Sequence, residues 1–333
     1  MSLWVSDLAS SIKGAEFVFG VERFQRFDDS LFANLKQWRS IMSKVWLVTG
    51  SASGLGRNIT EAVLASGARL VATARDPRRL DDVVKEYGDQ VRTALLDVAD
   101  ENAANSAVQA AVNAFGRLDV VVNNAGYGDI APFEQLSSER FKAVVDTNFY
   151  GVVNVTRAAL PIMRKQKSGC ILQISSLGGR LAWPGSTPYH AAKWAVGGFT
   201  ESLAQEVAPF GVRVCALEPG GMRTNWGARA NEKTPNLLPD YEPSVGTVIG
   251  ALRSYWGRET SDPVKVAEVI LRLAESDRLP AHLLVGSDAV QYAKQADETR
   301  TAEADAWREV SISTDVDAKG LQSYAGAAMS RPT

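Results

Sequence analysis

The chain has 333 residues, of which 45% are hydrophobic and 22% are charged, and its 36 Lys and Arg nearly balance its 38 Asp and Glu, for a formal net charge of −2. This composition is typical of a globular protein and lacks the basic excess expected of a nucleic-acid-binding protein. The only cysteines, Cys170 and Cys215, each lie inside an apolar run, which indicates a cytoplasmic protein without a disulfide. His190 and His282 lie far apart with no cysteine cluster nearby, so we expect no metal site.

Residues 1–42 are predicted to be an N-terminal extension, helical or partly disordered. The apolar cluster Phe17–Val21 is too short for a signal peptide or a membrane span. Two interpretations stand side by side, a docking or membrane-surface helix and a partly ordered extension. Met42 directly precedes the first predicted strand, so we hypothesise that it is the natural start and that residues 1–41 are dispensable. The side chains that recur on one helical face are Phe24, Phe27, Leu31, Leu35 and Trp38.

From Val45 onward, short apolar runs alternate with helical segments. Continuous apolar runs indicate strands that are buried on both faces, and β-α-β repetition builds a parallel sheet. The sequence therefore predicts an α/β fold: one doubly wound domain of the Rossmann type over residues 43–310, with a seven-stranded sheet and helices on both faces. Ligands of such sheets bind beyond the carboxyl ends of the strands. The predicted strands are Val45–Val48, Arg69–Thr73, Val91–Leu96, Leu118–Val122, Cys170–Ile174, Val212–Leu217 and His282–Val285.

Three segments lie outside this alternation. Residues 218–261 form the longest irregular stretch and are rich in Pro and Gly, which predicts a lid or binding loop. Residues 287–309 are predicted to be helical, and residues 311–333 to be a loose C-terminal tail.

A glycine-rich turn, Thr49–Gly56, follows the first strand and precedes a helix predicted over about 55–66. Glycine lets the backbone approach a pyrophosphate, and a helix N-terminus offers free N–H groups. The spacing differs from G-x-G-x-x-G, and a purely structural loop is the alternative explanation. The position between strand and helix favours nucleotide binding.

The tip of the second strand indicates which dinucleotide binds. Ala74 is neutral and Arg75 follows it, and a guanidinium can bind a 2′-phosphate, so we expect NADP. NAD stays possible if Asp76 binds the ribose instead. Alternatively, Arg75, Arg78 and Arg79 are only solvated surface charges.

Tyr189 and Lys193 lie four residues apart in a predicted helix, so their side chains share one face. A nearby ammonium favours the phenolate and is expected to lower the tyrosine pKa. Ser176, just after the fifth strand, is placed to hydrogen-bond the same substrate oxygen. Chance spacing and an ordinary polar turn are the alternative explanations.

Taken together, these motifs resemble the short-chain dehydrogenase/reductase family, in its compact single-domain branch, over about residues 44–286. Thr49–Gly56 matches T-G-x-x-x-G-x-G, Asn123–Gly126 matches N-N-A-G, and Tyr189 with Lys193 matches Y-x-x-x-K. The remaining matches are the segment Leu96-Asp97-Val98, the helix asparagine Asn148, the serine Ser176, and Pro219–Thr224 for P-G-x-x-x-T.

The resemblance implies hydride transfer between NADP(H) and a carbonyl or secondary alcohol. Tyr189 would be the general acid in reduction and the general base in oxidation, and Lys193 would hold the nicotinamide ribose and lower the Tyr189 pKa. Ser176 would orient the substrate together with Tyr189, and Asn148 would anchor a water linked to Lys193. The implied cofactor-binding residues are Gly50, Ser51, Ser53, Gly54, Leu55, Gly56, Arg75, Asp97, Val98, Asn123, Ala125, Gly126, Tyr189, Lys193, Pro219, Gly220 and Thr224.

The substrate and the partners are less defined by the sequence. Aromatic residues near the site indicate an apolar pocket for an aromatic, steroid-like or fatty carbonyl, or they pack the lid against the body. Family members commonly form homodimers or homotetramers through the helices that carry Asn148 and Tyr189. Two other hypotheses are a non-catalytic NADP-binding sensor and an interaction protein that recruits a partner through its leader helix. The aromatic residues are Trp183, Trp226, Tyr241, Tyr255 and Trp256.

Overall fold

The structure, a computed structural model, describes residues 44–316. The predicted extension over 1–42, with its apolar face and Met42, lies outside the described residues, as does the predicted tail beyond residue 316. Within residues 44–316, no helix has both the length and the apolar character that a membrane span needs.

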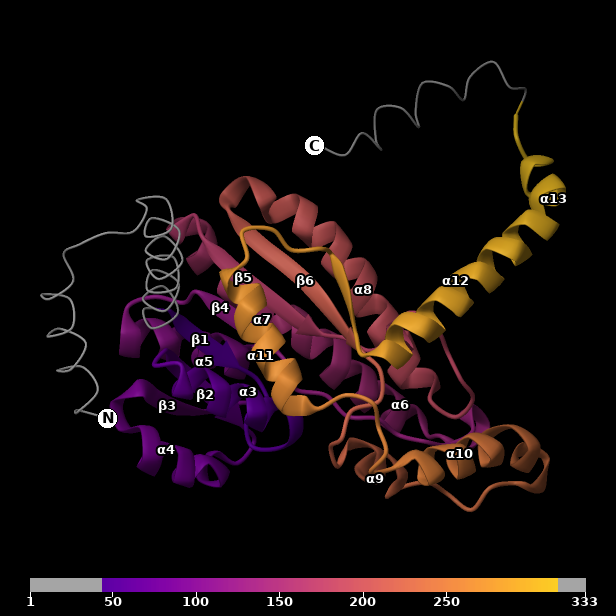
Figure 1. The fold of residues 1–333 in the computed structure, drawn as a ribbon, viewed down its shortest axis with the longest axis horizontal. Helices are drawn as coiled ribbons and strands as arrows, with labels where there is room; N and C mark the ends of the chain where they lie inside the picture. Colours follow the sequence, from indigo (N-terminus) through magenta and orange to yellow (C-terminus); the bar gives the residue numbers. More distant parts are fainter. Residues whose placement is uncertain (1–43, 317–333) are drawn as a thin grey trace, which may run out of the picture.

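A seven-stranded parallel sheet in the order β3-β2-β1-β4-β5-β6-β7 forms the centre of the molecule (Figure 1). The chain moves outward from β1 to β3, then crosses over and moves outward again from β4 to β7. This order confirms the predicted doubly wound fold of the Rossmann type. The strands are β1 (Val45–Val48), β2 (Arg69–Ala74), β3 (Val91–Leu95), β4 (Val120–Asn123), β5 (Gly169–Ile174), β6 (Val212–Pro219) and β7 (His282–Val285).

The helices of the main fold, in chain order, are α3 (Gly54–Ala65), α4 (Asp81–Tyr87), α5 (Glu101–Phe115), α6 (Ser138–Val145), α7 (Gly151–Gln166), α8 (Thr187–Val207) and α11 (Pro263–Glu275). Alternate residues of the strands bury into two separate cores. Trp46 and Leu70 pack with α3 and α11 on one face, whereas Leu47 and Ile171 pack with α5, α7 and α8 on the other. The sheet is therefore buried on both sides, as its continuous apolar strands predict.

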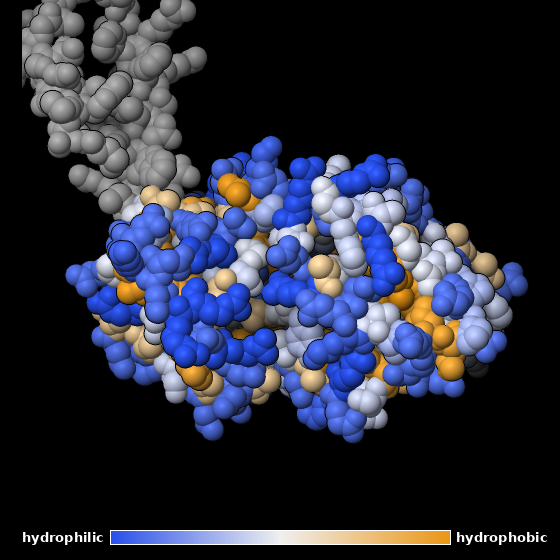
Figure 2. Space-filling view, turned by 90° about the horizontal axis from the view of Figure 1, so that it is seen from below, coloured by the Kyte–Doolittle hydropathy of each residue, from blue (hydrophilic) through white to orange (hydrophobic). Residues whose placement is uncertain are grey.

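The segment 218–261 contains short helices, although its composition predicts an irregular stretch. They are α9 (Trp226–Asn231) and α10 (Thr247–Tyr255), which lie together beside α6 in Figure 1. Val245 and Ile249 pack with Ile130 and Ala230 in a small core of their own. Figure 2 shows a mostly hydrophilic surface from below, with hydrophobic residues gathered on the right, over this lid.

Residues 287–309 are helical, as expected, and form α12 (Ser287–Ala306) and the start of α13 (Arg308–Ile312). The two helices extend away from the body of the molecule (Figure 1). Trp307 between them is 66% exposed.

Candidate active site

The glycine-rich turn between β1 and α3 leaves no room for side chains. Gly50 and Gly54 have left-handed φ values of 70° and 55°. A Cβ on Gly56 would lie 2.2 Å from the Gly50 carbonyl oxygen. Two residues outside the predicted set fix the turn: Asn124 Nδ2 donates to the Thr49 carbonyl, and Thr49 Oγ1 accepts from the Asn124 backbone N–H, each at 2.9 Å.

Three other residues of the turn have separate roles. Ser51 Oγ donates to the Val48 carbonyl at 2.9 Å, and Leu55 packs in the core. Ser53 precedes α3 without a side-chain hydrogen bond to the helix N-terminus. The first N–H groups of α3 therefore have no side-chain cap from Ser53, and their partial positive charge favours an anion.

Arg75 and Asp76 at the tip of β2 are in different situations. The Asp76 carboxylate accepts from the Arg78 backbone N–H at 3.3 Å and from its guanidinium at 2.8 and 3.0 Å. Among residues 44–316, Arg75 forms no ion pair and is exposed. Asp76 is thus already neutralised by Arg78, while Arg75 stays open to an anion.

The predicted residues after β3 and β4 separate into surface and interior groups. Asp97 is exposed and accepts from Ala99 N–H at 3.1 Å. Val98 is buried, and its backbone carbonyl accepts from Asn154 Nδ2 at 3.0 Å.

The side chain of Asn123 is turned into the protein interior, where its amide donates to Thr156 Oγ1 at 3.0 Å and to Gln173 Oε1 at 2.7 Å. This side chain does not join the predicted site. The Ala125 backbone N–H donates to Thr49 Oγ1 at 2.9 Å, so Ala125 lies against the glycine-rich turn.

The four predicted catalytic residues lie at the carboxyl ends of β4 and β5. The Ser176 hydroxyl lies beside the Tyr189 phenol and influences its pKa. Lys193 Nζ donates to the Ile174 carbonyl at 2.7 Å and lies 5.6 Å from the centre of the Tyr189 ring. The structure therefore brings Ser176, Tyr189 and Lys193 together.

Asn148 joins this group from a π-helical turn, Asp146–Tyr150, between α6 and α7. Its amide donates to the Tyr127 and Val144 carbonyls at 2.8 and 2.9 Å. Its Oδ1 is buried and has no hydrogen-bond partner among the described residues. A Cβ on Gly126 would lie 2.6 Å from this oxygen and 3.7 Å from Lys193 Nζ, so only a glycine leaves the space between them free.

Burial, and not the neighbouring ammonium, dominates the acidity of Tyr189. It raises the pKa of Tyr189 to about 12, and the hydrogen bond with Ser176 opposes this rise. Burial also lowers the pKa of Lys193 to about 8. The expected lowering of the Tyr189 pKa by Lys193 is therefore wrong in direction, because removal from water disfavours both the phenolate and the ammonium.

His190 ties the loop after Ser176 to α8, a role that its place beside Tyr189 does not reveal in the sequence. Its Nδ1 lies 2.8 Å from the Gly178 carbonyl, and its Nε2 accepts from the Trp183 backbone N–H at 3.2 Å. A carbonyl can only accept, so the ring is neutral and carries its proton on Nδ1. The ring also packs edge-on against Trp183.

The neutral state of His190 makes stability depend on pH. Burial lowers its pKa below the ordinary 6.5, against the effect of the Gly178 hydrogen bond. Below pH 6.5 the unfolded chain binds a proton that the folded chain does not, so the free energy of unfolding falls until pH reaches the folded pKa. When the pH is lowered from about 7.5 to about 5, the melting temperature of the wild type should fall further than that of His190→Asn. Equal losses in calorimetry would mean that His190 is not held neutral.

The segment after β6 reaches back to the glycine-rich turn. Gly220 N–H donates to the Val285 carbonyl at 3.0 Å, and Gly221 N–H donates to Asp288 Oδ2 at 2.7 Å. The side chain of Thr224 lies 3.9 Å from the position of a Cβ on Gly54. Pro219, at the end of β6, leads into this segment. The predicted clamp and the glycine-rich turn are thus neighbours.

The aromatic residues divide between the site and the lid. The ring centre of Trp226 lies 5.0 Å from that of Tyr189. Tyr241 donates to Glu134 Oε2 at 2.7 Å, the hydroxyl of Tyr255 lies 2.9 Å from that of Thr260, and the Trp256 indole packs against Gly227. Tyr255 and Trp256 therefore make contacts within the lid, and Tyr241 joins the lid to Glu134 outside it. Of the five aromatic residues, only Trp183 and Trp226 lie near Tyr189 or His190.

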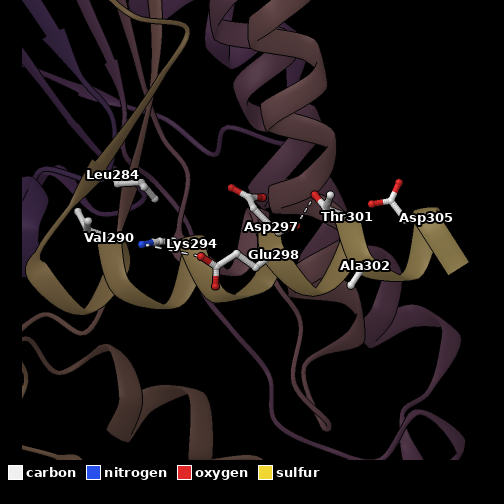
Figure 3. A pocket seen from close by; sticks show the side chains of 8 residues that line it. All are labelled: Leu284, Val290, Lys294, Asp297, Glu298, Thr301, Ala302 and Asp305. Carbon is white, nitrogen blue, oxygen red and sulfur yellow. Dashed lines mark hydrogen bonds and ion pairs between the residues drawn. The ribbon is translucent and has the colours of Figure 1, made fainter.

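A cavity of about 620 Å³ lies along α12 and contains none of the predicted site residues (Figure 3). Its wall includes Leu284 of β7 and polar side chains of one helix face, among them Lys294 and Glu298, which pair at 3.8 Å. Within residues 44–316, no three His, Cys, Asp or Glu side chains gather as a metal site. Cys170 and Cys215 are buried and free.

Comparison with known proteins agrees with this arrangement. The profile of the family described as short chain dehydrogenase matches residues 44–235. The chain belongs to the short-chain dehydrogenase/reductase family. This short-chain dehydrogenase is 46% identical to Oxidoreductase BOA17 of Botryotinia fuckeliana over 274 residues, which cover 82% of this chain and 100% of that protein.

Solved structures are similar as well. A short-chain dehydrogenase from Streptomyces avermitilis has a TM-score of 0.76 and 37% identity, covering 82% of this chain and 99% of that one. A 3-ketoacyl-(acyl-carrier-protein) reductase from Brucella melitensis, complexed with NADH, has a TM-score of 0.61 and 29% identity, covering 73% of this chain and 96% of that one. The likeness therefore extends over most of the chain.

Proposed function

We propose that this chain is an NADP(H)-dependent oxidoreductase that reduces a carbonyl to an alcohol or catalyses the reverse oxidation. The observation that carries the proposal is the meeting of Ser176, Tyr189, Lys193 and Asn148 at the carboxyl ends of β4 and β5. Such a group supplies a proton donor beside an oxygen that gains negative charge.

The residues present fit a bound dinucleotide. The glycine-rich turn leaves its backbone open, α3 begins without a side-chain cap, and Gly126 keeps the space between Lys193 and Asn148 free. The glycine-rich turn, Arg75, Thr224 and Lys193 would hold the dinucleotide. The reduced nicotinamide supplies the hydride, which this protein does not provide from its own side chains.

During reduction, the carbonyl carbon gains the hydride and its oxygen gains a proton from Tyr189. Ser176 donates a hydrogen bond to that oxygen and holds it in place. Tyr189 then regains a proton by way of Lys193, whose pKa of about 8 lets it lose and take up a proton near neutral pH. The buried Oδ1 of Asn148 offers an acceptor for a water that links Lys193 to solvent.

Arg75 is the basis for preferring NADP over NAD. Removing it in Arg75→Ala should raise the Kd of NADPH by about 10-fold or more, because a charge-assisted hydrogen bond to phosphate contributes about 1.5–3 kcal/mol. The Kd of NADH should not change, since NADH has no 2′-phosphate. Isothermal titration calorimetry with both dinucleotides measures this. An equal loss for the two would assign Arg75 another role.

The substrate is proposed to be an apolar or aromatic carbonyl. Trp226 lies against Tyr189, and Trp183 packs on His190, so aromatic surface borders the proton donor. The similar reductase from Brucella melitensis is named for a 3-ketoacyl substrate, which is such a carbonyl on an apolar chain. We also propose that the protein is cytoplasmic. We further propose that it forms a homodimer or homotetramer, and light scattering would test this oligomeric state.

The deciding experiment follows the oxidation of NADPH and of NADH in the presence of ketones, aldehydes and quinones. We expect turnover with NADPH on at least one apolar carbonyl. Tight binding of NADPH without turnover on any compound would favour a nucleotide sensor. Binding of neither dinucleotide would overturn the proposed function.

A further inference from the structure

A second cavity, of about 570 Å³, lies between the lid and the glycine-rich turn. Its wall combines residues from the start of α3 with residues from the segment around α9. Four of the lining side chains are arginines and one is acidic. The lining residues used below are Ser53, Arg57, Arg79, Arg223, Arg229 and Glu232.

The four arginines differ in how their charge is compensated. Arg57 is paired with Glu61 and with Asp82, each at 2.6 Å. Among the described residues, Arg79, Arg223 and Arg229 form no ion pair. The Arg223 guanidinium donates to the Glu259 backbone carbonyl, at 2.9 Å. Glu232 offsets one of the three remaining charges, so the cavity keeps a net positive charge.

Arg229 joins the lid to the glycine-rich turn. Its guanidinium donates to Ser53 Oγ at 3.3 Å and lies 3.8 Å from the position of a Cβ on Gly54. It therefore lies over the start of α3, where free N–H groups already favour an anion. Arg229 and Ser53, which are 176 positions apart in the chain, thus meet at the start of α3.

We propose that Arg229, assisted by Arg223, binds the diphosphate of the dinucleotide and so fastens the lid over the glycine-rich turn. This inference rests on the proposed function. A guanidinium suits the task, because its N–H groups match two phosphate oxygens at once. The diphosphate would replace the weak contact with Ser53 as the link between lid and turn.

Helix α9 connects the proposed diphosphate site to the proposed substrate pocket. Trp226, which packs against Tyr189, lies three residues before Arg229 in α9. Because residues three apart lie on the same side of a helix, fixing Arg229 also fixes Trp226. Trp226 already packs against Tyr189 at 5.0 Å, so the bound diphosphate would hold this aromatic wall in place.

The test measures equilibrium binding and needs no substrate. NADPH, ADP and 2′-AMP are titrated by calorimetry into wild type, Arg229→Gln and Arg229→Lys. We expect Arg229→Gln to raise the Kd of NADPH and of ADP by about 10-fold. 2′-AMP has no diphosphate, so its Kd should stay unchanged. Arg229→Lys should lie between, because lysine keeps the charge without the paired geometry.

Arg253→Gln is the matched control, because Arg253 is an exposed arginine of α10 that does not line the cavity. Its Kd values should equal those of wild type. Hydrogen exchange over residues 224–232 gives a second measurement: NADPH should slow it in wild type and in Arg253→Gln, but much less in Arg229→Gln.

Unchanged NADPH and ADP binding in Arg229→Gln would overturn this inference and leave the proposed function intact. An equal loss in Arg253→Gln would also overturn it, since the effect would then come from net charge alone. A wild type that binds no dinucleotide would contradict the proposed function itself.

Discussion

Tyr189→Phe should lower kcat by about 100-fold or more, while the Kd of NADPH stays unchanged, because the substitution removes only the proposed proton donor. Phenylalanine keeps the ring that packs against Trp226 and His190 and that lies near Lys193 Nζ. The surrounding structure should therefore survive. Steady-state kinetics on the substrate found by screening, together with a binding titration, measures both quantities.

Tyr241→Phe provides the control for this substitution. Tyr241 also loses a hydroxyl with a hydrogen-bond partner, Glu134, but it lies in the lid and not beside Ser176. Its kcat should equal that of wild type. A Tyr189→Phe enzyme with a normal kcat would show that another group donates the proton.

Gly56→Ala should abolish detectable dinucleotide binding and lower stability. The added Cβ would lie 2.2 Å from the Gly50 carbonyl oxygen and 2.4 Å from Asn124 Nδ2. The first is a backbone atom and the second is held by Thr49, so the whole turn must shift. Forcing an extra carbon into a packed site costs about 1–3 kcal/mol. Calorimetric titration with NADPH and thermal unfolding measure the two effects.

Gly250→Ala is the corresponding control, since Gly250 lies inside α10 with nothing within 4 Å of an added Cβ. Alanine in a helix is favoured over glycine by about 1 kcal/mol, so stability should rise slightly and NADPH binding should not change. Normal NADPH binding by Gly56→Ala would mean that the turn has more freedom than its contacts indicate.

The sheet could be predicted from the sequence because its strands are continuous apolar runs bounded by polar residues. All seven strands occur within two residues of their predicted ends. β4 begins at Val120, two residues after its predicted start at Leu118. Leu118 is apolar and buried, but its backbone N–H and carbonyl bond the side chain of Gln166 instead of a neighbouring strand. Such a side-chain partner, 48 positions away, leaves no signal in an apolar pattern.

The grouping of Ser176, Tyr189 and Lys193 could also be predicted, since motif spacing and strand ends place them together. The direction of the Tyr189 pKa could not, because spacing within a helix says nothing about burial. The contact of Arg229 with Ser53 and the hydrogen bonds of His190 could not be predicted from the sequence for a different reason. Both depend on how loops distant in sequence are laid over the sheet.

The π-helical turn at Asp146–Tyr150 makes the position of Asn148 sensitive to the number of residues in this segment. A wide turn holds one residue more than the regular pitch, and each residue of a helix advances the direction of its side chain by about 100°. Losing a single residue here would swing Asn148 away from Lys193 while leaving the amino-acid types around both untouched. The proposed proton route would thus depend on chain length at this point as much as on side-chain chemistry, and we expect insertions or deletions in this segment to disrupt it.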